Sequence, residues 1–350
     1  MRILILCFLA LCVAGRVIDF ESLGAIADDS SLETEWANGA LLNSTWNKLQ
    51  PGDTFVISNK TFHVMGGILV TQDVIDVTFD IQGTLSFSDD RVQWPRTQDT
   101  GHVLEAIQFS YLQDVTFTSS GSPDNRGTLN GNGAVWWGAI NFLHHQEDRP
   151  RLISVSKSQN VLFERILLKD SAFWTFWFQN CEGLEVRYSE IDARRDQADK
   201  HTKWDLTAFN TDGYDITGNN VYIHHVKIWN DDDCISVKDG STNMLFEHIE
   251  ASGLGLVIGS IGSSRVDNIT FRHAVMQESV KGIYMKTRWR DDGPIGSAAS
   301  ISRILYENIT IISPPQFAIW IGPAQQTGQP CSLLWPHGSA TCSMSGYQTW

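Results

Sequence analysis

The chain has 350 residues, of which 42% are hydrophobic and 19% charged, and this suits one large globular domain or two ordinary ones. Its 40 acidic and 26 basic residues give a formal net charge of −14. Proteins that bind nucleic acid or anionic membranes need basic patches, so this charge balance disfavours both kinds of partner.

The N-terminal segment predicts a secretory signal peptide spanning residues 1–15. It reads MRILILCFLALCVAG: Arg2 precedes an apolar run that ends in small residues, with cleavage expected near Ala14 or Gly15. The alternative is a buried core strand. No later apolar run is long enough to span a bilayer. We therefore expect a soluble, secreted, extracellular protein.

Two further features fit a secretory route. N-glycosylation sequons predict glycans at four positions, Asn43, Asn59, Asn268 and Asn308. Near the C-terminus, Cys331 and Cys342 enclose a short loop and are expected to form a disulfide in an oxidising compartment. The sequence does not indicate whether Cys181 and Cys234 pair.

A short phrase that alternates apolar and polar residues recurs along the chain. The copies open with Asn or Gly: NVLFERI at Asn160, GLEVRYSEI at Gly183, NVYIHHVKI at Asn220, NMLFEHI at Asn243 and NITFRHAV at Asn268. Each copy reads as a turn followed by a strand. A repeat of about 23 to 25 residues built from strands predicts an all-β fold, a parallel β-helix, over residues 16–350 as a single domain. An antiparallel sandwich is the alternative, but hairpin-type Asn-Gly or Asp-Gly pairs rarely separate the copies.

A second apolar run follows each phrase, as in TFWFQN, DDDCISV, GLGLVIG, GIYMKT and FAIWIG. In a solenoid these runs would stack into one sheet, with neighbouring strands about 4.8 Å apart. Asp212 and Asp233 each stand four residues before an apolar residue of this sheet, Ile216 and Val237. The two carboxylates should therefore lie side by side on adjacent coils, with Asp232 beside them.

Four motifs resemble, in order and spacing, the signature segments of glycoside hydrolase family 28, the polygalacturonases and related pectin hydrolases. They are NTDG at Asn210, DDC at Asp232, G-x-G-x-x-I-G-S-I-G at Gly253 and GIYMKT at Gly282. The upstream segments GTLNGNGAVWWG and RPRLISV are also similar, so the resemblance covers roughly residues 18–345. It implies a right-handed parallel β-helix that hydrolyses pectin-type, galacturonic-acid-containing polysaccharide without a metal or another cofactor.

The resemblance implies roles for individual residues. Asp232 matches the general acid, while Asp212 and Asp233 match the pair that activates water. An inverting glycosidase needs one protonated carboxyl and one carboxylate base, and crowding three acids raises the pKa of at least one. Asn210 is expected to order the site by hydrogen bonding.

The chain departs from the family pattern at two positions. Leu254 stands where the third segment usually has a His that supports the acid. Tyr284 replaces the usual Arg of the fourth segment, while Lys286 remains. We expect Lys286 to contact an acidic sugar and Tyr284 to shift preference away from unsubstituted polygalacturonate. His224 and His225 belong to another strand row and are expected at the surface.

Two other functions are compatible with the sequence. Asp231, Asp232 and Asp233 could bind Ca²⁺ in a polysaccharide lyase, whose catalytic base would be Lys286, Arg288 or Arg290. The pairing of NTDG with DDC favours the hydrolase. Alternatively, the solenoid could only bind polysaccharide through exposed aromatic faces, for which the candidates are Trp174, Trp177, Trp289 and Trp320. Core packing explains each Trp equally well, and the three Asp favour an enzyme.

The C-terminal residues SGYQTW read as the approach to another coil rather than as a polar cap. Because solenoids need capped ends, we expect the protein to continue into further coils. The predicted protein is a monomer whose partner is the polysaccharide, and the sequence does not separate endo from exo cleavage.

Overall fold

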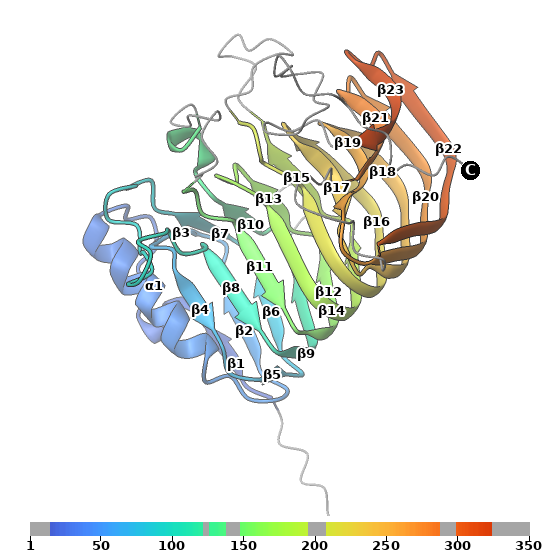
Figure 1. Ribbon diagram of the computed structural model, residues 1–350. Coiled ribbons are helices and arrows are strands. Elements are labelled where there is room, and N and C mark those ends of the chain that lie inside the picture. The colour runs from blue at the N-terminus through green and yellow to red at the C-terminus, as the bar shows by residue number, and fades with distance from the viewer. Residues whose placement is uncertain (1–14, 122–125, 138–147, 195–207, 288–298, 324–350) are drawn as a thin grey trace, which may run out of the picture.

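The computed structural model describes residues 15–121, 126–137, 148–194, 208–287 and 299–323. Most of the predicted signal peptide and the predicted Cys331–Cys342 disulfide lie outside these residues, as do Arg288, Trp289 and Arg290. Within them the strand ladders are parallel, and the predicted right-handed parallel β-helix is confirmed (Figure 1). The extent of the single domain stays a prediction.

One row of stacked strands corresponds to the sheet expected from the second apolar runs. In order it contains β4 (Ile68–Val70), β8 (Ile107–Ser110), β11 (Ile153–Ser156), β14 (Phe176–Arg187), β16 (Tyr214–Asn230), β17 (Asp233–Val237), β19 (Gly255–Ile261), β21 (Lys281–Thr287) and β23 (Phe317–Pro323). The register joins Phe176 to Tyr214 and Tyr214 to Ile235. The apolar runs therefore stack as predicted.

A second row carries the repeated phrases. It consists of the later parts of β14 and β16 together with β5 (Val74–Ile75), β9 (Leu112–Thr118), β12 (Gln159–Glu164), β18 (Thr242–Ser252), β20 (Arg265–Gln277) and β22 (Ser300–Ile312). Val221 pairs with Met244, Met244 with Ile269 and Ile269 with Ile304. One copy of the phrase is therefore one coil of the solenoid.

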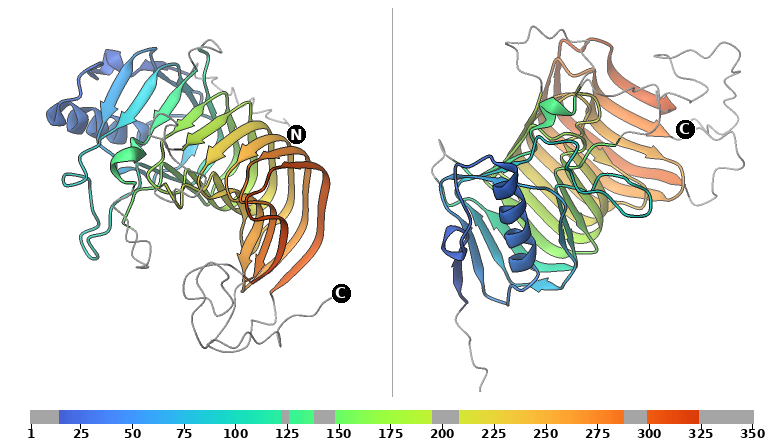
Figure 2. Two further views of the ribbon diagram at one scale, coloured as in Figure 1. Left: turned by 90° about the horizontal axis from the view of Figure 1, so that it is seen from above. Right: turned by 90° about the vertical axis from the view of Figure 1, so that its left-hand side faces the viewer.

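Shorter strands complete the coils of the N-terminal half. They are β1 (Val17–Asp19), β2 (Thr54–Ile57), β3 (Thr61–Val64), β6 (Thr78–Ile81), β7 (Thr84–Phe87), β10 (Thr128–Asn130), β13 (Leu167–Lys169) and β15 (Glu190–Ala193), with the 3₁₀ helices η1 (Glu21–Leu23) and η2 (Gly133–Val135). Figure 2 shows the coils stacked in chain order from the N-terminal strands to β22 and β23.

Helix α1 (Leu32–Trp46) was not expected from the sequence. It begins at Ser31, whose hydroxyl accepts a hydrogen bond from the Thr34 N–H at 3.3 Å, and it lies at the N-terminal end of the solenoid (Figure 1). Its Trp46 side chain is buried, with its ring 5.2 Å from that of Phe79 and 5.4 Å from that of Phe109. The helix therefore covers apolar side chains of the first coils, as a solenoid cap must.

The Asn or Gly that opens each repeat occupies a left-handed corner of the coil. The φ angles are positive at Asn160, Gly183, Asn220, Asn243 and Asn268. Glycine and asparagine tolerate this conformation better than other residues, which explains why the phrase opens with them. Side chains link the corners between coils: Asn268 donates to Asn243 at 2.8 Å, and Asn243 to Asn219 at 2.8 Å.

A second left-handed corner follows five residues after the first, and most of its residues gave no turn signal in the sequence. Its members have positive φ: Arg165, Tyr188, His225, His248, His273 and Asn308. The imidazole rings stack from coil to coil, at 4.5 Å between His225 and His248 and 5.3 Å between His248 and His273. His225 is exposed as expected, but the prediction for His224 is wrong. His224 is buried because its ring packs 4.2 Å from that of Tyr222.

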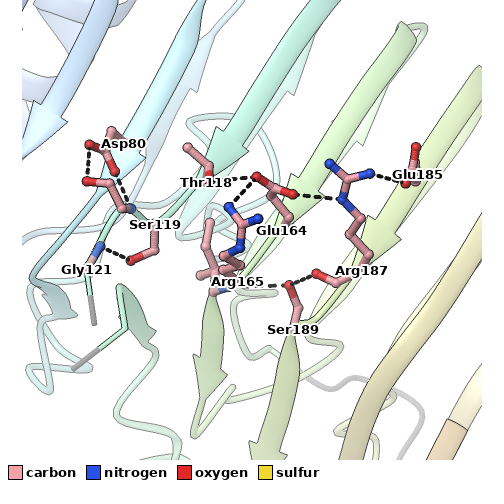
Figure 3. Close-up of polar contacts among 11 residues, drawn as sticks. Asp80, Thr118, Ser119, Gly121, Glu164, Arg165, Glu185, Arg187 and Ser189 are labelled. Carbon is pink, nitrogen blue, oxygen red and sulfur yellow. Dashed lines mark hydrogen bonds and ion pairs between the residues drawn. The ribbon is translucent and has the colours of Figure 1, made fainter. Parts of the chain in front are cut away.

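Like side chains also stack inside and outside the coils. In the interior, the rings of Phe246, Phe271 and Tyr306 lie 4.6 and 4.9 Å apart on successive coils. On the outer face, Figure 3 shows Glu164 accepting hydrogen bonds from Thr118 and from Arg187 on the neighbouring coils. Such stacks hold each coil in register with the next.

The edge formed by β22 and β23 exposes large apolar side chains, namely Leu305, Ile312, Phe317, Ile319 and Ile321. No helix in the described part of the chain is both long and apolar enough to cross a membrane. The predicted monomeric state remains a prediction.

Candidate active site

The sequence prediction that three aspartates meet is confirmed. The segment before β16 is tied to β17 by a hydrogen bond from the Gly213 N–H to the Asp233 carbonyl at 2.8 Å. One carboxylate oxygen each of Asp212, Asp232 and Asp233 lies within 4.8 Å of the others. The three residues are only 3%, 4% and 1% exposed. Like charges this close, and this far from water, cannot all ionise easily.

Two glycines of the motifs allow this close approach of the backbone. A Cβ on Gly213 would lie 2.3 Å from the Cys234 carbonyl oxygen, and one on Gly253 would lie 2.7 Å from the Asp232 carbonyl oxygen. Any larger residue would push the aspartate-bearing segments apart. These glycines therefore bring the three carboxylates together.

Asp232 is the carboxyl with the environment of a general acid. Its Oδ2 accepts a hydrogen bond from the Asn210 N–H at 3.1 Å, and its Oδ1 accepts one from the Asp233 N–H at 2.8 Å. These bonds favour the ionised form, but burial, and next the charge of Asp233, raise the pKa of Asp232 to about 7. Asn210 therefore makes the kind of hydrogen bond predicted for it, to the Asp232 carboxyl, while its role in the site stays a prediction.

Asp233 is paired with a counter-charge, the ammonium of Lys286. Its Oδ2 accepts hydrogen bonds from Lys286 Nζ at 2.7 Å and from Ser236 Oγ at 3.1 Å. Burial lowers the pKa of the Lys286 ammonium, but the nearby acidic groups, Asp233 first among them, together outweigh burial and raise that pKa. An ammonium at this distance favours a charged carboxylate. Asp233 is therefore suited to be the base.

Asp212 is flanked by two residues that sequence reasoning missed. Burial, then Asp215 and Asp232, raises the pKa of Asp212 well above its ordinary value. Asp215 is fully buried and forms an ion pair with Lys238, which follows β17. The signal for Asp215 was present in NTDGYD, which places a second acid three residues after Asp212.

Leu254 and Tyr284, the two residues that depart from the family pattern, both lie beside the aspartate cluster. Leu254 contributes its backbone N–H to the Asp232 carbonyl at 2.6 Å, but its side chain cannot hold a proton. Tyr284 is 1% exposed, and its ring centre lies 4.8 Å from Lys281 Nζ and 4.9 Å from Lys286 Nζ. The predicted contacts of Lys286 and Tyr284 with substrate therefore stay predictions, because both side chains are buried against other groups.

The tryptophans on the preceding coil pack against a cation. The Arg151 guanidinium lies 4.5 Å from the ring centre of Trp174 and 4.0 Å from that of Trp177. On the last described strand, the Trp320 ring lies 5.1 Å from that of Phe317. These contacts favour packing over sugar stacking for Trp174 and Trp177.

The geometry also bears on the calcium alternative. Among the described residues, the acids close enough to share a cation are Asp212, Asp232 and Asp233, rather than the consecutive Asp231, Asp232 and Asp233. Lys286 already brings a positive charge to this group. The arrangement favours acid–base chemistry.

Comparison with known proteins places the chain in a family. The family model of glycosyl hydrolases family 28 matches residues 54–332. A polygalacturonase of Chamaecyparis obtusa is 26% identical over 315 residues, which are 86% of this chain and 55% of the relative. An exopolygalacturonase of Cochliobolus carbonum is 30% identical over 229 residues, covering 61% of this chain and 48% of the relative.

A solved structure agrees on the fold. The endo-xylogalacturonan hydrolase from Aspergillus tubingensis superposes with a TM-score of 0.69 at 23% identity, covering 90% of this chain and 78% of that one. The chain spans about half the length of the curated relatives it matches. Because the family model matches most of the chain, and its matched region contains the aspartate cluster, the chain belongs to glycosyl hydrolases family 28.

Proposed function

We propose that the protein is a secreted glycoside hydrolase that cleaves glycosidic bonds of pectin-type polysaccharide by an inverting acid–base mechanism. The observation that carries this proposal is the contrast between two neighbouring carboxyls: Asp232 has its pKa raised to about 7, while Asp233 is paired with Lys286. Two carboxyls with different environments provide the acid and the base of glycoside hydrolysis.

In the proposed reaction, Asp232 donates its proton to the glycosidic oxygen as the bond to the anomeric carbon breaks. A water molecule between Asp212 and Asp233 attacks that carbon from the opposite face, and Asp233 takes the proton that the water loses. Asp232 leaves the step ionised and Asp233 protonated, and exchange with solvent restores both. Each bond broken is balanced by one formed.

The spacing of the carboxyls bears on whether the reaction inverts or retains the anomeric configuration. In inverting enzymes the two carboxyls are usually about 6.5–9.5 Å apart, to leave room for water. Here the nearest oxygens lie within 4.8 Å, but three acids share the site instead of two. We infer that the water is held from one side by two carboxylates on adjacent coils. Nuclear magnetic resonance of the first product should show an inverted anomeric configuration, and retention would contradict the mechanism.

For the substrate we propose a galacturonic-acid-containing chain, because the matched relatives include polygalacturonases. Tyr284 stands at the position of the usual Arg and lacks the guanidinium fork that grips a carboxylate. This favours a substituted galacturonan over unsubstituted polygalacturonate. A screen of defined pectin fractions, with released reducing ends as the readout, tests the substrate class.

The acid assignment is tested by Asp232→Asn. Turnover should fall by at least ~100-fold, as expected for loss of a general acid, while substrate binding is largely kept. Asp192→Asn, at a partly exposed ion pair with Arg194, is the matched control and should leave turnover unchanged. Near wild-type turnover in Asp232→Asn would refute the assignment. Calcium-dependent release of unsaturated, ultraviolet-absorbing products would instead favour a lyase.

A further inference from the structure

Asn230 is the last residue of β16, and its side chain ties together the two segments that bear the aspartates. Only 2% of the residue is exposed. Its Nδ2 donates hydrogen bonds to the carbonyl oxygens of Thr211, Asp232 and Asp233, each at 3.0 Å. The amide has two hydrogens for three acceptors, so one hydrogen is shared. One side chain therefore joins the residue before Asp212 to the backbone of both other acids.

The orientation of the Asn230 amide follows from its surroundings. Three carbonyl oxygens, which can only accept, converge on one side of the amide, so the NH₂ group must lie there. The Oδ1 atom packs against Gly253, since a Cβ on Gly253 would lie 2.2 Å from that oxygen. No donor in the described part of the chain reaches Oδ1. Gly253 therefore leaves room for this amide as well as for the close approach of the backbone.

These bonds explain how two consecutive aspartates can face one site. Consecutive side chains of a regular strand point to opposite faces of the sheet. Asp232 immediately precedes β17, which begins at Asp233, and the carbonyls of both residues turn toward the same Asn230 amide. The backbone is bent at this point, and a carboxyl oxygen of each residue lies within 4.8 Å of one of Asp212. Asn230 is the side chain that holds this bend.

Thr211 makes a second connection between the same two segments. The residue is fully buried, and its hydroxyl donates to the Ala208 carbonyl at 2.8 Å. The same oxygen accepts a hydrogen bond from the Asp231 N–H at 3.0 Å, and a hydroxyl can do both at once. Together with Asn230, Thr211 therefore joins the segment before β16 to the segment before β17.

We propose that Asn230 and Thr211 are positioning residues that turn the three aspartates toward one another, so that acid and base face one substrate. In the described structure neither side chain bonds to a carboxyl group, and both act through the backbone of the aspartate-bearing segments. The inference rests on the proposed hydrolytic function, and it adds the side chains that set the geometry of its acids.

Three variants and one control test this role. Asn230→Ala removes the amide, Thr211→Val keeps the shape of the side chain but removes the hydroxyl, and Thr211→Ser keeps the hydroxyl. Asn38→Ala is the matched control. Asn38, on α1 at the N-terminal end of the solenoid, is 1% exposed, and its amide donates to the carbonyls of Ile26 at 2.8 Å and His63 at 2.9 Å. Turnover and KM are measured across pH on a pectin fraction that the wild type cleaves.

We expect Asn230→Ala to lower kcat by about 10- to 100-fold, with KM within about threefold of the wild type, because a misplacement of about 1 Å is enough for such a loss. Thr211→Val should lower kcat by about 10-fold, and Thr211→Ser should restore it. Asn38→Ala should lower the unfolding free energy and leave kcat unchanged, because its bonds lie far from the aspartates.

The pH profile gives a readout that a purely structural role would not move. Asp232 faces the charges of Asp212, Asp233 and Lys286, and burial, followed by Asp233, raises its pKa. Separating the carboxyls weakens their repulsion and lowers that pKa. The basic limb, which reports ionisation of the acid, should therefore move to lower pH in Asn230→Ala and in the valine variant, but not in the control.

Two results would overturn the proposal. A loss of stability like that of Asn38→Ala, with unchanged kcat and an unshifted basic limb, would show that Asn230 and Thr211 serve only the fold. A higher KM with unchanged kcat would show that they shape the binding of substrate instead. Thermal unfolding confirms that each variant is folded, and if Asn230→Ala is not, the milder Thr211 variants decide.

A measurement without substrate keeps this inference separate from the proposed function. If the wild type cleaves no pectin fraction, the proposed function fails, yet the placement of the carboxyls can still be tested. Nuclear magnetic resonance titration of ¹³C-labelled aspartate carboxyls, with the Asp232 signal assigned through Asp232→Asn, should show a lower pKa of Asp232 in Thr211→Val than in the wild type. Equal pKa values would contradict the proposal whatever the enzyme acts on.

Discussion

Lys286 is a buried residue that acts on the candidate site through its charge. Its ammonium is 2.7 Å from Asp233 Oδ2, and the side chain is almost fully buried. Leu254 stands in place of a histidine, and its side chain has no group that could hold a proton beside Asp232. In the described structure, burial and the charge of Asp233 raise the pKa of Asp232, and Lys286 opposes them.

Lys286→Met should therefore impair both stability and catalysis. Removing one partner of a buried ion pair leaves Asp233 without compensation, which typically costs about 3–5 kcal/mol of unfolding free energy. The pKa values of the cluster should rise, so the acidic limb of the activity profile should move to higher pH. Urea unfolding and pH–rate curves measure the two effects. A Lys286→Met variant as stable as the wild type, with an unshifted profile, would show that the Lys286–Asp233 pair has neither effect.

The raised pKa of Asp232 also makes stability depend on pH. The carboxyl has an ordinary pKa of 3.8 and a folded-state value of about 7, so the folded protein binds this proton more tightly than the unfolded chain. Its contribution to stability is fully present below 3.8 and is lost as pH rises through about 7. The unfolding free energy of the wild type should fall, relative to that of Asp232→Asn, across this window. A constant difference would mean that Asp232 is not protonated in the folded protein.

At the scale of elements, the two corners show what sequence patterns can and cannot reveal. The first corner was readable because Asn and Gly tolerate positive φ and recur with the coil. The second corner is made by residues such as Tyr188 and His248, which carry no turn signal and reach this conformation through stacking with their neighbours. Helix α1 was not predicted for a different reason. It occurs once, and a repeat pattern carries information only about elements that recur.

The first corner makes a measurable prediction. Asn243→Ala should destabilise the fold by about 1–2 kcal/mol, because alanine pays for the left-handed backbone and loses the hydrogen bonds to Asn219 and Asn268. Asn243→Gly keeps the backbone conformation and loses only the side chain, so it should cost less. Urea unfolding of both variants separates the two contributions. Equal stabilities would show that backbone strain at this corner is negligible.

Strand periodicity was enough to predict the meeting of the aspartates in the candidate site, but not the rest of the site. Counting back from Ile216 and Val237 brought Asp212 and Asp233 together correctly, since strands of adjacent coils run in register. The counter-charges were not predictable in the same way. Lys238 meets Asp215 on a diagonal, and Lys286 meets Asp233 from a coil 53 residues further along the chain. Such pairings depend on side-chain direction in three dimensions, which periodicity does not contain.

For the molecule as a whole, the separation of these charges along the chain has a consequence for the order of assembly. The acids of the cluster lie between residues 212 and 233, whereas Lys286 comes later. During synthesis from the N-terminus, the coils that bear the aspartates are complete before the ammonium that compensates Asp233 has been made. Those coils therefore meet while the Asp233 carboxylate still lacks its ammonium partner, which arrives only with β21. Docking of β21 thus lowers the electrostatic cost of burying Asp233.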